Sequence, residues 1–374
     1  MAYIARQFFQ NPFLGLTFAS AIVELLVLRP GARILAGAIG IGTVLFFLLQ
    51  SQVAAGGYFG ATAIGWLASC GAMCLLAIAL QAVGVGGRAE DMVHRARVLF
   101  AVFVLVVVLE TLNGKFLRFT GVAFPETWDL ALATLDSRFG GQPAFAVGRF
   151  VLEYNWALNF SFLAYNGLLL GLVSLMALET KHTFGDSLTT FFQFSVAGII
   201  GAGFYLFFPV SGPRYAFSFF PSHDPVLALA NLVPSVVVPA ARNGMPSLHT
   251  AWVVLLFIRA RCQGTGAMVC FGVLMVGTII ATLGQGEHYL LDLVVAVPMA
   301  VGVSFWNIAD VRWSEWLVGG GLVLASLGWV IFLPATLVLL YTYGWLLMTL
   351  SVLTVTGPLF VRWRVVCRRR QRGL

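Results

Sequence analysis

The sequence predicts an all-α polytopic membrane protein with about eleven transmembrane helices. Of its 374 residues, 60% are hydrophobic and 10% are charged, whereas soluble domains average about 45–50% apolar and about 25% charged residues. The mean hydropathy is +0.92, and apolar runs of about 20 residues, the length that crosses a bilayer, recur along the chain. Together these observations exclude a soluble enzyme, a disordered protein and a secreted disulfide scaffold.

The predicted spans are apolar segments bounded by glycine, proline or charged residues. The first and the fourth are short, so either could instead be re-entrant or lie in the membrane interface. In chain order the eleven segments are 13–28, 33–53, 60–84, 97–112, 155–178, 188–208, 247–263, 266–285, 289–307, 316–333 and 335–357.

The distribution of lysine and arginine predicts how the chain is oriented. With the basic C-terminal tail on the inside, alternating spans place 15 of the 22 Lys and Arg residues inside and the other 7 outside. This split agrees with the tendency of cytoplasmic loops to collect positive charge. The same tendency accounts for the net charge of +7. We therefore expect a plasma-membrane or inner-membrane protein with a cytoplasmic C-terminus and no nucleic-acid partner.

Two loops on the predicted outer side are long, 113–154 and 209–246. The first contains the segment Glu126–Phe139, whose apolar residues recur at mixed helical spacing, and we expect a helix that lies on the membrane surface. The second is rich in proline and is expected to be irregular. Because long loops in compact domains are usually functional or disordered, the outer face is the favoured place for a site.

Three polar clusters stand at the predicted outer ends of spans, in 208–215, 242–252 and 284–292. In the third, His288 and Asp292 are four residues apart, so on a helix they share one face. A carboxylate that holds one ring nitrogen leaves the other as a nucleophile or base. The alternative is a structural pair that fixes the helix in place.

The other two clusters add a second histidine and an arginine. His249 follows Pro246 and Ser247, a helix-start pattern, and could protonate a leaving oxygen. Arg214 offers a planar fork for a phosphate. Taken singly, these residues could be a satisfied histidine and a head-group anchor. Together with His288 and Asp292 they indicate phosphoryl or phosphodiester transfer. No cluster of Asp, Glu or Cys suggests a metal site, and we expect neither metal nor cofactor.

These segments resemble the phosphatidic acid phosphatase type 2 (PAP2) superfamily. The family's Pro-Ser-Gly-His motif appears as Pro246-Ser247-Leu248-His249, and its His-x-x-x-Asp motif spans His288 to Asp292. Leu248 in place of glycine, and Glu287 and Tyr289 around the histidine, most resemble the branch that contains inositol phosphorylceramide synthase. The resemblance implies that His288 attacks phosphorus to form a phosphohistidine, that Asp292 orients it, and that His249 protonates the departing oxygen.

The resemblance covers roughly 97–307, which would form a six-helix PAP2-like core. This suggests three regions: N-terminal helices in 1–96, the PAP2-like core with both long loops in 97–307, and C-terminal helices with the basic tail in 308–374. The family's first motif has a lysine where Phe207 stands, and its third has an arginine where Thr282 stands. Fewer cations favour a phosphodiester, with one negative charge, over a phosphomonoester with nearly two.

Several other residues are candidates for substrate binding. Arg242, Lys115 and Arg118 could replace the missing cations, and Ser247 and Tyr289 lie beside the two histidines in the sequence.

The expected function is transfer of a phosphate or phosphorylated head group from a lipid-phosphate or phospholipid donor to a lipid or polyol acceptor. With water as the acceptor, the same chemistry gives a lipid phosphate phosphatase. A different class is a transporter or flippase, suggested by Glu24, Glu110 and Glu153 in or beside apolar runs. A transporter predicts related halves, and the sequence shows no such internal symmetry.

Overall fold

The computed structural model describes residue 40 and residues 115–179, 184–237 and 240–371. The predicted spans 13–28, 33–53, 60–84 and 97–112 lie outside these residues, apart from residue 40, as do Glu24 and Glu110. The chain forms two compact units, unit 1 with Met1–Phe116 and Leu169–His182, and unit 2 with Leu117–Leu168 and Thr183–Leu374. All three polar clusters belong to unit 2.

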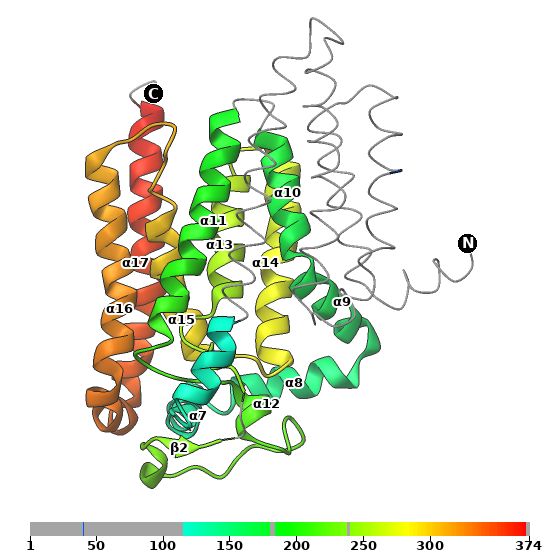
Figure 1. Cartoon of the computed structure of the whole chain (residues 1–374), viewed down its shortest axis with the longest axis vertical. Coiled ribbons are helices and arrows are strands. Elements are labelled where there is room, and N and C mark those ends of the chain that lie inside the picture. Colours follow the sequence, from blue (N-terminus) through cyan, green and yellow to red (C-terminus); the bar gives the residue numbers. More distant parts are fainter. Residues whose placement is uncertain (1–39, 41–114, 180–183, 238–239, 372–374) are drawn as a thin grey trace, which may run out of the picture. The chain divides into compact units, whose positions relative to one another are not determined.

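The described residues are mostly helical (Figure 1). Besides a helical stretch that ends at residue 123, the helices and strands are β1 (Glu126–Thr127), α7 (Asp129–Asp136), η2 (Ser137–Phe139), α8 (Pro143–Glu153), α9 (Asn155–Asn166), α10 (Leu168–Glu179), α11 (Phe184–Phe204), α12 (Pro213–Ala216), η3 (Leu229–Asn231), β2 (Ser235–Val236), α13 (Leu248–Ala260), α14 (Thr265–Gly284), α15 (Leu290–Val303), α16 (Trp313–Thr342) and α17 (Gly344–Gln371).

Four of the described helices are long and apolar enough to cross a membrane. They lie in α11, α14, α16 and α17, and a fifth span results if the broken pair formed by α9 and α10 is one crossing. The protein is therefore an integral membrane protein, as the composition predicts. The described residues do not confirm the number eleven.

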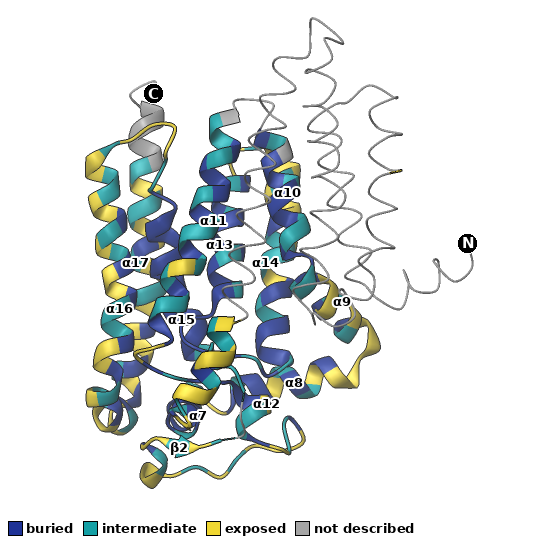
Figure 2. Cartoon of the chain, in the orientation of Figure 1, coloured by how far each residue is buried: buried dark blue, intermediate teal, exposed yellow. Residues whose placement is uncertain are grey.

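Two further predicted spans, α13 and α15, are only 13 and 14 residues long. Every residue of α15 from Leu291 to Val303 is buried (Figure 2), and the helix packs against α11, α13, α16 and α17. A helix that is apolar on nearly all sides is either a core helix or a membrane span, and the burial of α15 identifies the first. α15 is therefore the central helix of unit 2, surrounded by protein rather than by lipid.

The C-terminal helices differ from the predicted spans. The prediction ends one span at 333 and starts the next at 335, because proline often ends a helix. Instead α16 continues through Pro334 to Thr342, and α17 begins at Gly344. Membrane helices tolerate proline because neighbouring groups and local adjustments satisfy the freed carbonyl. The predicted boundary at Pro334 was therefore wrong.

The helix predicted in Glu126–Phe139 exists as α7 and η2, but its predicted place on the membrane surface was wrong. Seven of the eight residues of α7 are buried, and the helix packs against α12, α15 and α16. Its two aspartates accept hydrogen bonds from backbone N–H groups of other segments. The polar face of α7 is therefore turned toward protein and not toward water. The loop also contains α8, an unpredicted helix that exposes Phe150 and Leu152.

The two long loops are joined to each other at one end of unit 2. β1 pairs with β2 in an antiparallel register, Glu126 opposite Val236, and the ring of Trp128 stacks on Phe208 at 5.4 Å. Loop 209–246 is otherwise irregular, apart from the single turns α12 and η3. Figure 1 shows α7, α12 and β2 at the end where α13 and α15 begin, opposite the C-terminus of α17. Both long loops thus lie at the end of unit 2 that carries the three polar clusters.

Candidate active site

His288 lies in the turn between α14 and α15, with 2% of its surface exposed. Its backbone N–H donates to the carbonyl of Thr282 at 3.2 Å. Its ring atom Nδ1 is 2.9 Å from the carbonyl oxygen of Gly244. Because a carbonyl can only accept, Nδ1 must carry the proton in this hydrogen bond, and Nε2 then holds a lone pair. The Gly244 carbonyl therefore holds His288 in the tautomer that a nucleophile requires.

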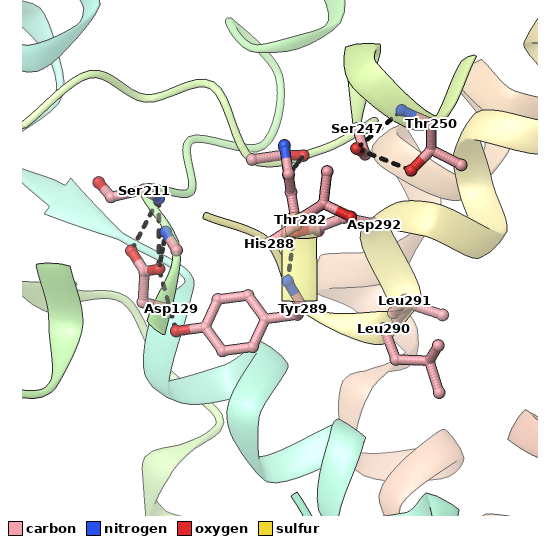
Figure 3. A network of polar contacts seen from close by, with 12 residues as sticks. Asp129, Ser211, Ser247, Thr250, Thr282, His288, Tyr289, Leu290, Leu291 and Asp292 are labelled. Carbon is pink, nitrogen blue, oxygen red and sulfur yellow. Dashed lines mark hydrogen bonds and ion pairs between the residues drawn. The ribbon is translucent and has the colours of Figure 1, made fainter. Parts of the chain in front are cut away.

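Asp292 is fully buried one turn into α15 and approaches the same ring nitrogen. Its Oδ2 is 3.6 Å from Nδ1 of His288 and accepts the backbone N–H of Tyr289 at 2.8 Å. Its Oδ1 has no hydrogen-bond partner among the described residues. The pair resembles the predicted one, except that His288 precedes the helix and the Gly244 carbonyl is the nearer partner. The side chain of Asp292 thus lies close to the ring of His288 (Figure 3).

His249 lies in the first turn of α13, which Ser247 caps. The hydroxyl of Ser247 accepts the N–H of Thr250 at 3.3 Å and its O–H at 3.0 Å. The N–H of Ser247 donates to the backbone carbonyl of Asp292 at 3.1 Å. This bond joins the start of α13 to the start of α15. The observed contacts of Ser247 are those of a helix cap, and its substrate contact stays a prediction.

The ring of His249 is held between two aromatic side chains. It stacks on Tyr165 with centroids 3.9 Å apart and meets Trp252 edge-on at 5.9 Å. The sequence reasoning missed Tyr165, which comes from α9 and belongs to no recognisable motif. The bond between Ser247 and Asp292 thus brings the start of the helix that carries His249 next to the turn that carries His288.

Arg214 lies in the short helix α12 and contacts the segment before His288. Its N–H donates to the carbonyl of Gly286 at 3.0 Å, and its guanidinium pairs with Glu287 at 2.7 Å while its side chain stays half-exposed. Burial acts to lower the pKa of Arg214, but the charge of Glu287 and the phenols of Tyr215 and Tyr165 raise it above its usual value. The first and third clusters therefore meet through Arg214, which contacts the two residues that precede His288.

The other predicted cations lie differently. Arg242 is buried, and its guanidinium donates to the carbonyls of Phe124, Pro125 and Ala240 and to the hydroxyl of Ser211. It therefore joins the two long loops. Arg118 and Lys115 are exposed, and Lys115 belongs to unit 1. Substrate contacts for these three residues stay predictions.

The two positions at which the family motifs have a lysine and an arginine hold uncharged residues here, Phe207 and Thr282. Phe207 is exposed, whereas Thr282 is buried and its hydroxyl donates to the carbonyl of Ile279 at 2.9 Å. Tyr289 is also buried, and its hydroxyl donates to Asp129 at 3.1 Å. Tyr289 therefore makes a contact inside the protein, and its predicted substrate contact remains untested.

Asp129 and Asp136 of α7 are fully buried and contact the turns that carry Arg214 and His288. The sequence reasoning missed both. A signal was available, because aspartates seven residues apart lie on the same face of a helix, and on an apolar helix that face must find hydrogen-bond donors. Among the described residues, no group of three or more His, Cys, Asp or Glu side chains is placed to hold a metal ion.

Residues 130–306 match the model of the PAP2 superfamily. The matched range includes α7 from Leu130 onward and the segments that carry Arg214, His249, His288 and Asp292. Members of this superfamily are phosphatases or phosphotransferases, so the match supports an enzyme that acts on phosphorylated substrates. A search of curated proteins and a search of solved structures each found no match.

Proposed function

We propose that the protein is a membrane enzyme that moves a phosphate or phosphorylated head group from a lipid donor to a lipid or polyol acceptor. The reaction proceeds through a phosphohistidine on His288. The observation that carries this proposal is the 2.9 Å contact between Nδ1 of His288 and the Gly244 carbonyl, which leaves Nε2 as a nucleophile. The match of residues 130–306 supports it.

In the first step, Arg214 binds the non-bridging oxygens of the donor phosphate. Nε2 of His288 attacks phosphorus, so that a P–N bond forms and the bond to the leaving oxygen breaks. His249 donates a proton to that oxygen. The carboxylate of Asp292, 3.6 Å from the ring, stabilises the positive charge that develops on His288.

In the second step, neutral His249 accepts the proton of the acceptor hydroxyl. The acceptor oxygen attacks phosphorus, the P–N bond breaks, and His288 returns to its starting tautomer. Water in place of the acceptor gives a phosphatase, and the PAP2 match is equally compatible with that outcome. Leu248, the residue that favours the synthase-like branch, packs against Gly201 of α11.

We also propose that the site faces the outside of the cell or an organelle lumen. The end of unit 2 opposite the site carries Arg259 and Arg261 at the end of α13, Arg312 before α16, and the basic end of α17. Arginines concentrate on the cytoplasmic side of membrane proteins. This distribution supports a cytoplasmic C-terminus.

The test is turnover of a radiolabelled phospholipid by the purified protein in lipid nanodiscs, with and without a polyol or lipid acceptor. We expect an acceptor-dependent labelled product and an acid-labile labelled protein. His288→Ala should abolish both. His223→Ala, which removes an exposed histidine stacked on Phe219, is the matched control.

Each outcome of this test has a separate meaning. Release of free phosphate with no acceptor dependence would identify a phosphatase instead. Turnover that survives His288→Ala would contradict the phosphohistidine mechanism.

A further inference from the structure

We infer that α7 is a positioning element of the active site, in which Asp129 and Asp136 fix the turn that carries Arg214 relative to the turn that carries His288. This inference rests on the proposed function. Both aspartates are fully buried, so they act through the two turns and not on the substrate.

Asp129 joins the first and third clusters. It accepts the N–H of Ser211 at 3.1 Å and that of Gly212 at 2.8 Å, and Figure 3 shows Asp129 between Ser211 and Tyr289. It also accepts the hydroxyl of Tyr289, which follows His288, at 3.1 Å. One carboxylate thus holds the residues before Arg214 and the residue after the proposed nucleophile.

The two turns are also in direct contact. Gly212 has a φ of 112°, and a Cβ at this position would collide with the carbonyl of Glu287. Only glycine both adopts this backbone conformation readily and leaves room for the neighbouring chain. A small shift of either turn would therefore move Arg214 relative to His288.

Asp136 holds the helix that follows the nucleophile. Its carboxylate accepts the N–H of Leu290 at 2.7 Å and that of Leu291 at 3.3 Å. These amides belong to the first turn of α15, where the helix itself offers no acceptor. Asp136 thus caps α15 from another helix and fixes the turn at His288.

The spacing of the two aspartates lets one short helix contact both turns. Seven residues correspond to about two turns of helix, so both carboxylates lie on one face, about 10 Å apart along the axis. α7 therefore holds two turns that are more than 70 residues apart in the sequence. A misplacement of about 1 Å in a reacting geometry can lower turnover about a hundredfold.

The experiment compares kcat and KM for the phospholipid donor among variants of the full-length protein. Asp129→Leu, which leaves the N–H groups of Ser211 and Gly212 without an acceptor, should lower kcat about a hundredfold with KM changed about threefold or less. Asp129→Asn keeps an acceptor oxygen and should restore kcat to within about tenfold of wild type. Thr134→Val, which removes a buried hydroxyl of α7 bonded only within the helix, is the matched control and should leave kcat unchanged.

Tyr289→Phe is a second test that does not depend on whether the leucine variant folds. It removes only the hydroxyl that reaches Asp129 and should lower kcat about tenfold. Wild-type kcat in Tyr289→Phe, or in folded Asp129→Leu, would overturn the inference, as would a loss in Asp129→Asn equal to that in Asp129→Leu. His288→Ala separates the two proposals, since turnover without His288 contradicts the proposed function itself.

Discussion

His288 has two neighbours that contribute in different ways. The Gly244 carbonyl, at 2.9 Å from Nδ1, determines which nitrogen carries the proton, whereas Asp292, at 3.6 Å, contributes charge. Where a carboxylate alone fixes the tautomer of a catalytic histidine, its loss costs about 10⁴-fold in turnover. Here the backbone keeps the tautomer when the carboxylate is replaced.

Asp292→Asn should therefore lower kcat by only about ten- to a hundredfold, with the protein still folded. The amide oxygen can take the place of Oδ2, which accepts the N–H of Tyr289, and the amide nitrogen can take that of Oδ1, which has no described partner. Turnover and the thermal midpoint of the variant check this. Loss of the folded protein would instead indicate that the His288–Asp292 pair is structural.

A second prediction at the residue scale concerns Glu287, which should compete with an anionic substrate for Arg214 if Arg214 binds the phosphate as we propose. Glu287→Gln removes the charge of a half-exposed pair with an N–O distance of 2.7 Å, and such pairs are individually weak. We expect the inhibition constant of inorganic phosphate to be about three- to tenfold lower for the variant than for wild type.

The control for this prediction is Asp310→Asn, which breaks the comparable Arg312–Asp310 pair, 2.8 Å long, beyond the far end of α15. Its inhibition constant for phosphate should equal that of wild type. Equal constants for Glu287→Gln and wild type would mean that Arg214 does not bind the anion.

At the scale of elements, the sequence predicted the helices that carry the motifs, and it predicted a helix at α7 but placed it wrongly on the membrane surface. Residues near His249 and His288 stand out because polar groups are rare in apolar segments. The location of α7 was harder to predict, because an amphipathic pattern is the same for a helix on a membrane surface and for one buried against protein. Only Asp129 and Asp136 distinguish the two cases. Tyr165 could not be found, because its contact with His249 depends on the packing of α9.

Asp136 predicts a pH dependence of stability. Burial, together with the nearby charge of Asp292, raises the pKa of Asp136 from 3.8 to about 8. The folded state therefore binds this proton more tightly than the unfolded state, so the contribution is complete below pH 3.8 and is lost as the pH rises through about 8. The thermal midpoint in nanodiscs should fall between pH 6 and pH 9.

Asp136→Asn cannot titrate and should show a smaller fall of the midpoint over this range. Thr134→Val, which leaves Asp136 in place, should retain the wild-type slope. Parallel curves for Asp136→Asn and wild type would show that another group causes the dependence.

At the scale of the molecule, the site and the C-terminus lie at opposite ends of unit 2 (Figure 1). Helices α16 and α17, which the family match does not include, belong to the same compact unit as the motif segments because both pack on α15. The composition predicted the membrane, but it could not predict which helices face lipid, since α15 and α16 are both apolar beyond the single acidic residue in the first turn of each.

Labelling from outside the cell tests the proposed orientation. Cys262 is a free, exposed thiol in the connection between α13 and α14, at the end away from the site. In a variant whose only cysteine is Cys262, an impermeant maleimide should react only after the membrane is opened. A single cysteine introduced by His223→Cys, in the site-side loop, should react in intact cells. The reverse pattern would place the site in the cytoplasm.

The helix that follows His288, α15, is surrounded by other helices and does not contact the lipid chains of the bilayer. Residues Leu291–Val303 of this helix are buried in protein, so bilayer thickness and acyl composition act first on the outer helices. Lipid composition should consequently alter how readily the donor arrives and how readily the product leaves. The intrinsic rate at which His288 is phosphorylated, once the donor is bound, should be insulated from those changes.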